Sequence, residues 1–222
     1  NCGVKLKQKK TFKRDKKEYG KLSEHIGYIP LVIVSPEDSE LVKEGSEIRR
    51  KSIDQTLSQF NREYLSAVMA YNKALSTRNS MLRQENTEKT LFEVVEAQME
   101  YAANCVFKYR KEFIEDFVSV FNKFYQEICG GGESVSLSYT SHLYNENLSV
   151  QLAESRTKDA ILGYTTRGIH RDDLESFIFV EHTEAALKGA VNVNAFLEHR
   201  LVFNFSSILG HSCYDGNRLT TV

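Results

Sequence analysis

The chain has 222 residues, of which 41% are hydrophobic and 27% charged, and its formal net charge is −1. This composition excludes a disordered chain and is typical of a globular protein with one large domain or two small ones. No apolar run approaches the roughly 20 residues of a transmembrane helix, and no signal peptide is recognisable, which predicts a cytoplasmic protein with no membrane partner. The four cysteines show no C-x-x-C spacing, so we expect reduced thiols and no metal site.

The first 21 residues are strongly basic, with nine Lys or Arg against two acids, whereas the rest of the chain is net acidic. Residues 2–14 alternate between polar and apolar side chains, which predicts strands with one solvated face. Two interpretations of this basic segment stay open: contact with the phosphates of DNA, or simply the wet face of a hairpin. The candidate DNA-binding residues are Lys7, Lys9, Lys10, Lys13, Arg14, Lys16 and Lys17.

A short apolar run, residues 31–34, is rich in β-branched side chains and predicts a strand buried on both faces. The sequence SPED at 35–38 has the composition of a helix start, because Ser caps, Pro suits the first turn and acids favour the positive end of the helix dipole. We therefore expect the chain to pass from a buried strand into helix at this point. The simplest interpretation of Glu37 and Asp38 is that they stabilise a helix terminus.

The sequence pattern predicts that most of the middle of the chain is helical. A turn at 21–26 and a short helix at 36–43 precede a long pattern of apolar residues at helical spacing, from Ser46 to Leu82 and from 90 to 128. The polar residues 83–89 interrupt it, so two long helices should pack antiparallel as an arm with an aromatic core. The later elements expected are a glycine-rich exit at 130–132, a strand at 134–139, a helix at 148–158 and a strand at 177–180.

Three sequence patterns bear on whether the chain carries catalytic, metal-binding or phosphate-binding residues. His170-Arg171-Asp172 imitates the kinase catalytic triplet, but its partner asparagine and a glycine-rich loop are missing, which excludes a kinase. Adjacent His170, Asp172 and Asp173 do not converge as metal ligands do, so no metal site is predicted. The pattern G-x-x-x-x-G-K-[ST] does not occur, so the chain has no phosphate loop of its own, and no catalytic residue is assigned.

Two stretches resemble the RecF family of bacterial DNA-repair ATPases. One runs from KKEYG at 16–20 to NSML at 79–82 and includes the pairs Arg49-Arg50 and Arg78-Asn79. The other is LGYTTRGIHRDDLE at 162–175, which is similar to the G-x-H-R-D-D-L segment of that family. The order and spacing of these motifs are specific, and the resemblance covers residues 5–175, about three-quarters of the chain.

The resemblance implies an α/β fold: a fragment of an ABC-type P-loop ATPase head, related to the SMC proteins, with a large helical lobe. Its expected parts are a piece of the core sheet with a basic edge (1–35), the helical lobe or arm (36–130), return strands and a helix (131–182) and a divergent tail (183–222). The family assigns Ser35, Glu37 and Asp38 to a nucleotide-sensing loop. It assigns His170, Arg171, Asp172 and Asp173 to a motif that braces the lobe against the core.

The resemblance also implies a role in DNA repair, recombination, replication and the SOS response, in which the complete protein helps to load a recombinase at single-strand gaps. The partners it implies are single-stranded or gapped duplex DNA, recombination mediator proteins and a second copy in an ATP-dependent homodimer. ATP and Mg²⁺ are expected for the complete protein and no cofactor for this chain alone. Whether the chain is an enzyme stays open, because the family is a weak ATPase but the P-loop, signature and Walker B motifs are missing here.

The two ends of the chain depart from the family pattern. Asn1 is not an initiator methionine, which predicts a fragment or a processed product. From about residue 176 the sequence matches neither the expected signature motif nor the paired aspartates, and we suggest a reading-frame slip between 176 and 190. A different class of function also stays open: a non-catalytic helical module whose arm docks on a partner protein. A third possibility is a non-functional remnant.

Overall fold

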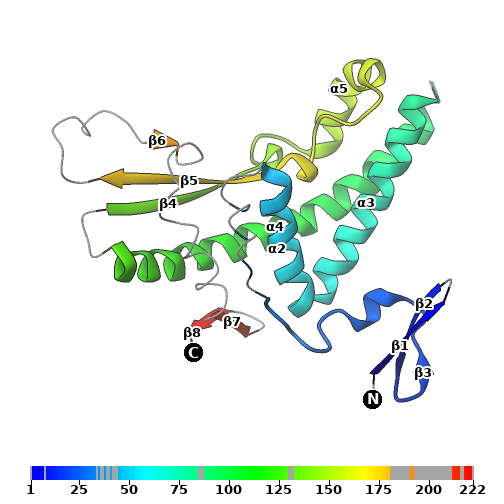
Figure 1. The fold of residues 1–222 in the computed structure, drawn as a ribbon. Helices are drawn as coiled ribbons and strands as arrows, with labels where there is room; N and C mark the ends of the chain where they lie inside the picture. Colours follow the sequence, from blue (N-terminus) through cyan, green and yellow to red (C-terminus); the bar gives the residue numbers. More distant parts are fainter. Residues whose placement is uncertain are drawn as a thin grey trace.

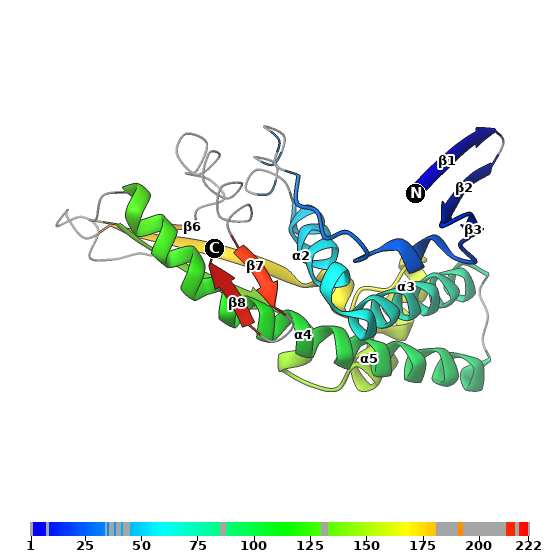
Figure 2. The same ribbon diagram turned by 90° about the horizontal axis from the view of Figure 1, so that it is seen from below.

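The computed structural model describes residues 2–7, 9–33, 35, 38, 41, 45–84, 88–129, 133–180, 191–192, 212–215 and 218–221. An arm of long helices forms the body, with an antiparallel sheet along one part of it and a small basic hairpin at the other side (Figures 1 and 2). The longer elements, in chain order, are β1 (Cys2–Lys7), β2 (Lys9–Arg14), α2 (Ser46–Phe60), α3 (Arg62–Arg83), α4 (Lys89–Cys129), β4 (Glu133–Thr140), α5 (Leu148–Leu162) and β5 (Asp173–Val180). The shorter ones are β3 (Lys17–Glu18), η1 (Leu22–His25), η3 (His142–Tyr144), η4 (Ile169–Arg171), β6 (Val191–Asn192), β7 (Ser212–Asp215) and β8 (Arg218–Thr221).

The basic N-terminal segment forms a three-stranded antiparallel sheet in the order β1-β2-β3. This confirms the strands predicted for residues 2–14. A two-residue turn joins β2 to β3, and both of its residues have positive φ, 49° at Asp15 and 69° at Lys16. Turns of this kind match the twist of the strands that they connect. The Arg14 guanidinium lies 3.9 Å from the centre of the Tyr28 ring, which holds the hairpin against the chain that follows it.

The segment after the hairpin differs from the prediction. The turn expected at 21–26 is present as η1, but Leu31 is 61% exposed and Ile33 is 75% exposed, and residues 31–33 belong to neither a helix nor a strand. The predicted buried strand is therefore wrong for 31–33, because no described layer covers these side chains. The Leu31 N–H donates to Gln59 Oε1 at 2.7 Å, so a polar side chain of α2 holds the run. Val34 and most of the predicted helix at 36–43 lie outside the described residues.

The long helical pattern is interrupted at Asn61, where the sequence predicted continuous helix. Asn61 has extended backbone angles (φ −125°, ψ 109°), and its side chain accepts a hydrogen bond from the Tyr64 N–H at 2.9 Å. Asn61 is therefore the N-cap of α3. The apolar spacing continues across the break, since Ile53 and Leu57 of α2 and Tyr64 of α3 all belong to one core.

Helices α3 and α4 pack antiparallel, as predicted, because Glu63 contacts Tyr109 near one end of the pair while Arg78 contacts Glu96 near the other. The 41 residues of α4 span about 60 Å at the rise of an α-helix. The expected aromatic core is present. Successive rings on α4 lie 5.8 to 6.1 Å apart and belong to Phe113, Phe117, Phe121 and Tyr125.

The predicted strand at 134–139 and the helix at 148–158 are confirmed as β4 and α5. Strand β4 pairs antiparallel with β5, with Val135 opposite Ile178 and Thr140 opposite Asp173, and this sheet packs along α4 (Figure 1). The α5 helix ends at Gly163, whose φ of 73° suits a helix C-terminus. The glycines at 130–132 and most of the tail 183–222 lie outside the described residues. Among the described helices, none is long and apolar enough to cross a membrane.

Candidate functional site

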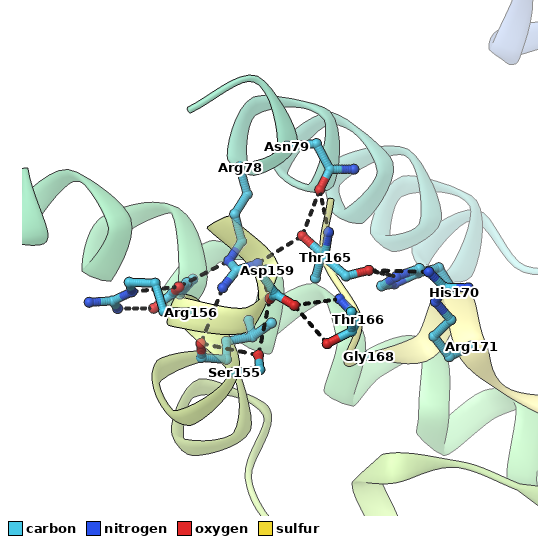
Figure 3. Close-up of polar contacts among 12 residues, drawn as sticks. Arg78, Asn79, Ser155, Arg156, Asp159, Thr165, Thr166, Gly168, His170 and Arg171 are labelled. Carbon is cyan, nitrogen blue, oxygen red and sulfur yellow. Dashed lines mark hydrogen bonds and ion pairs between the residues drawn. The ribbon is translucent and has the colours of Figure 1, made fainter. Parts of the chain in front are cut away.

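A buried arginine connects the arm to α5 and to the loop that follows it. Arg78 of α3 is completely buried, and its guanidinium donates to four oxygen atoms (Figure 3). Its partners are Glu96 Oε1 at 3.0 Å, Asp159 Oδ2 at 2.7 Å, Thr165 Oγ1 at 2.9 Å and the Leu152 carbonyl at 3.1 Å. These contacts satisfy the charge and most of the donors of Arg78, which a buried guanidinium requires.

The same network fixes the loop at 163–168 from both sides (Figure 3). Asp159 Oδ1 accepts hydrogen bonds from the Thr166 N–H at 3.0 Å and from its hydroxyl at 2.6 Å. Asn79 Oδ1 accepts from the Thr165 N–H at 2.8 Å and from its hydroxyl at 2.7 Å. The loop is therefore held by α5 on one side and by α3 on the other.

A second buried arginine, Arg110 of α4, connects α2 to the η4 turn. Its guanidinium lies 2.9 Å from Asp54 Oδ1, 2.9 Å from Asp172 Oδ2 and 2.9 Å from the Ile169 carbonyl. The Tyr139 hydroxyl also donates to Asp172. Burial lowers the pKa of Arg110, but nearby Tyr64, Asp54 and Asp172 outweigh it and hold the pKa well above its ordinary value. The positive charge of Arg110 is thus permanent.

The loop and the η4 turn meet at His170. Its Nδ1 lies 2.8 Å from the Tyr71 hydroxyl and its Nε2 lies 3.0 Å from the Thr165 carbonyl. A neutral ring satisfies both contacts, with Nε2–H donating to Thr165 and Nδ1 accepting from Tyr71. Burial lowers the pKa of His170 to about 4, which agrees with the neutral form at physiological pH.

The two arginines of the 49–50 pair meet the same segment from α2, although the chain separates them from it by more than 120 residues. Arg49 forms a two-pronged ion pair with Asp173, at 2.8 and 3.0 Å. Arg50 donates to the Asp172 carbonyl. Gly168, with φ at 124°, lies so close to the Tyr71 hydroxyl that an added Cβ would be 2.3 Å from it. A glycine is thus needed where the segment passes over α3.

The remaining predicted residues lie elsewhere. The Ser35 N–H donates to Asp38 Oδ2 at 2.6 Å, the return contact of a capping box, which agrees with the helix-terminus interpretation. Glu37 lies outside the described residues. Lys13, Arg14, Lys16 and Lys17 are exposed on the hairpin, whereas only the backbone is described for Lys7, Lys9 and Lys10.

Sequence reasoning overlooked the acidic partners of the two arginines, Glu96, Asp159 and Asp54. A signal was present, because Arg78 follows Tyr71 by seven residues and Arg110 follows Val106 by four, within the apolar stripes of their helices. A charge inside an apolar stripe indicates a buried ion pair, since an unpaired charge is too costly there.

The described residues do not offer the groups that hold ATP and Mg²⁺. The phosphate-loop pattern is missing from the sequence, and within the described ranges no three His, Cys, Asp or Glu side chains are grouped as a metal site requires.

No protein-family model matches the chain. It is 48% identical over 174 residues to the DNA replication and repair protein RecF of Parabacteroides distasonis, which covers 78% of this chain and 48% of that protein. It is 49% identical over 178 residues to the protein of the same name from Bacteroides fragilis, which covers 80% and 48% respectively. The chain belongs to the RecF family. It spans about half the length of the curated relatives that it matches.

Solved RecF structures share the fold. The chain superimposes with a TM-score of 0.79 on the recombination mediator protein RecF-ATPrS in the RecFOR pathway, at 25% identity, over 94% of this chain and 56% of that chain. The RecF-ATP structure gives 0.71 at 27% identity, over 84% and 52%. These likenesses confirm the expected fold class, an α/β fragment of an ABC-type ATPase head with a large helical lobe.

Proposed function

We propose that this chain is the arm-bearing segment of a RecF protein that binds DNA in recombination and repair. The observation that carries the proposal is the identity of 48% and 49% to curated RecF proteins over 78% and 80% of the chain. The complete protein would bind ATP with Mg²⁺, form a homodimer and act with recombination mediator proteins to load a recombinase at single-strand gaps. The neighbouring structures support this, since they are RecF with nucleotide in the RecFOR pathway.

The basic hairpin is the surface that we assign to DNA. Its described side chains Lys13, Arg14, Lys16 and Lys17 are exposed; Lys16 lies in the two-residue turn and Lys17 begins β3. Exposed lysine and arginine side chains bind phosphates by displacing counterions, so the affinity falls as salt rises.

A salt titration tests this assignment. We expect binding of the 222-residue chain to single-stranded or gapped DNA to weaken steeply with salt, and Lys16→Gln/Lys17→Gln to reduce the slope of log affinity against log salt by about 2. The matched control is Lys73→Gln/Lys108→Gln, which removes two exposed charges from the arm and should leave the slope unchanged. Equal slopes for the two double variants would remove the hairpin from the DNA surface.

The segment at 170–173 is proposed to brace the helical lobe. The support for this role is geometric: His170 contacts α3, Asp172 contacts α4 and Asp173 contacts α2. Arg171 adds a contact to the Tyr164 ring at 5.5 Å. For Ser35, Glu37 and Asp38 a nucleotide-sensing role in the complete protein stays a proposal, and the capping contact between Ser35 and Asp38 would hold that turn in place.

A helical interaction module is the second candidate function. It is favoured by a groove of about 490 Å³ on the arm between α3 and α4, with alanines on both walls and Tyr101, 84% exposed, at its edge. If this function is correct, the chain binds a recombination mediator protein with an affinity that does not depend on salt concentration. Tyr101→Ala should abolish this binding, and the chain should not bind DNA. Steep salt dependence of DNA binding would argue against it.

A further inference from the structure

A large cleft lies beside α2, on the side where residues 26–33 pass. It has a volume of about 1050 Å³ and is bounded by this segment, by α2 and α3, and by the η4 turn. Asp54, Arg110 and Ile169 of the second arginine network also line it. Cavities of this size accommodate a ligand as large as a nucleotide.

The walls of the cleft differ in chemistry. One wall is apolar and is formed by Ile26, Leu31, Ile33, Leu65 and Val68. The other carries Arg50, Lys51 and Arg171, of which Lys51 and Arg171 are exposed and Arg50 is half-buried. A ligand that fits both walls has an anionic part and an apolar part.

The acidic side chains that line the cleft are Glu47 and Asp54, and Arg50 already donates one hydrogen bond, to the Asp172 carbonyl. Asp54 accepts hydrogen bonds from Arg110 and from the Tyr64 hydroxyl, so its charge is already paired, and Glu47 is exposed to solvent. Burial, followed by repulsion from Arg110, lowers the pKa of Arg50, while Asp172, Asp173 and Glu47 raise it in part. A phosphate beside Arg50 would act in the same direction as these carboxylates.

The basic hairpin is fixed to the same cleft. Arg14 stacks on Tyr28, and the segment that carries Tyr28 is held on the α2–α3 corner by Gln59 and by Arg62. Arg62 donates to the Ser23 carbonyl at 3.0 Å and to the Glu24 carbonyl at 3.1 Å. The hairpin and the cleft are therefore connected through the segment that carries Tyr28.

We propose that the cleft binds a single strand of DNA, with its phosphates at Arg50, Lys51 and Arg171 and a base against Leu31 and Ile33. The proposal rests on the DNA-binding function above and gives the path of the strand. A single strand offers an accessible base next to each phosphate, as the two walls require. A duplex keeps its bases paired inside the double helix, where they cannot contact the apolar wall.

A tryptophan reporter tests occupancy directly, because the chain contains no tryptophan. Ile33→Trp places the reporter on the apolar wall at a side chain that is 75% exposed, and Tyr101→Trp places a control in the arm groove at one that is 84% exposed. We expect an oligo-dT strand to quench the fluorescence of Ile33→Trp and to leave that of Tyr101→Trp unchanged. Equal responses, or none from Ile33→Trp under conditions where anisotropy shows the strand bound, overturn the cleft proposal.

Charge variants separate this proposal from the hairpin assignment. Measured by anisotropy of labelled oligo-dT, Lys51→Gln and Arg171→Gln should each weaken binding about 3- to 10-fold, whereas Lys73→Gln should not. Loss of affinity in Lys16→Gln/Lys17→Gln alone would overturn the cleft and leave the proposed function intact. No binding by the unaltered chain would overturn both. Equal competition by duplex and by single strand would also overturn the cleft as a single-strand site.

Discussion

Arg78 and Ile33 each lie in an environment that is the opposite of the one favoured by the chemistry of the side chain. Arg78 is charged and 0% exposed, whereas Ile33 is apolar and 75% exposed. The difference is explained by the partners that surround each residue. Helices α4 and α5 and the loop at 163–168 surround Arg78 with oxygen atoms, whereas no described layer covers residues 31–33. Burial in this molecule is therefore decided by the available partners as much as by hydrophobicity.

The largest effect should come from removing the buried charge. Arg78→Met leaves the buried Asp159 without its ion-pair partner and leaves Glu96 with Arg156 alone, so we expect the free energy of unfolding to fall by about 3–5 kcal/mol. Urea unfolding followed by circular dichroism measures it. The control Lys73→Met, exposed on the same helix, should stay within about 0.5 kcal/mol of the parent. A loss below about 1 kcal/mol for Arg78→Met would mean that the network does not stabilise the fold.

The His170 contacts should make stability depend on pH. The pKa of His170 is about 4 in the folded protein and near 6.5 when unfolded, so the unfolded chain binds more protons between these values. Stability is therefore fully present above pH 6.5 and falls by about 3 kcal/mol as the pH drops to 4. Unfolding free energies across this range should depend less on pH in His170→Gln. Identical profiles for the two proteins would contradict the buried neutral histidine.

Gly168, two residues before His170, allows a test of the close packing between the η4 turn and α3. In Gly168→Ala the new carbon would lie 2.3 Å from the Tyr71 hydroxyl, at a φ of 124°. We expect a loss of about 2–3 kcal/mol. Adding Tyr71→Phe removes the overlapping atom, so the double variant should lose less than the two single losses together. Gly45→Ala is the control, since no atom of the described residues lies within 4 Å of its added carbon. Strict additivity would show that the close approach to Tyr71 is not the cause.

The smallest effect should come from the exposed apolar run. Ile33→Ser should change the free energy of unfolding by less than about 0.5 kcal/mol, as substitutions at exposed positions do. Leu57→Ala on α2, where the side chain is 1% exposed, should cost about 2–5 kcal/mol. If Ile33→Ser costs as much as Leu57→Ala, residues 31–33 are covered, as the sequence alone predicted.

Local patterns predicted the local structure well. Alternation predicted the N-terminal hairpin, and helical spacing with a polar interruption predicted the antiparallel arm, because both signals depend on neighbours in the sequence. The break at Asn61 was missed because the apolar spacing continues from Leu57 to Tyr64 across it. The capping preference of asparagine was the available signal.

The contacts of the site could not be predicted from periodicity. Arg49 meets Asp173 across 124 positions, and Arg110 meets Asp54 and Asp172 on two different elements. Spacing carries no information on such distances. The resemblance to the RecF family placed Arg49-Arg50 and residues 170–173 among its motifs, but their mutual contact became visible only in the fold.

Helix α4 sets the distance between the two arginine networks. Glu96 joins one network and Arg110 the other, 14 residues along, which is about 21 Å and close to four helical turns. The two side chains therefore project from nearly the same side. Deleting a single residue between them would turn one anchor about 100° away from its partners while the other stayed in place. Insertions and deletions in α4 are thus compatible with this architecture outside the stretch from Glu96 to Arg110, but not within it.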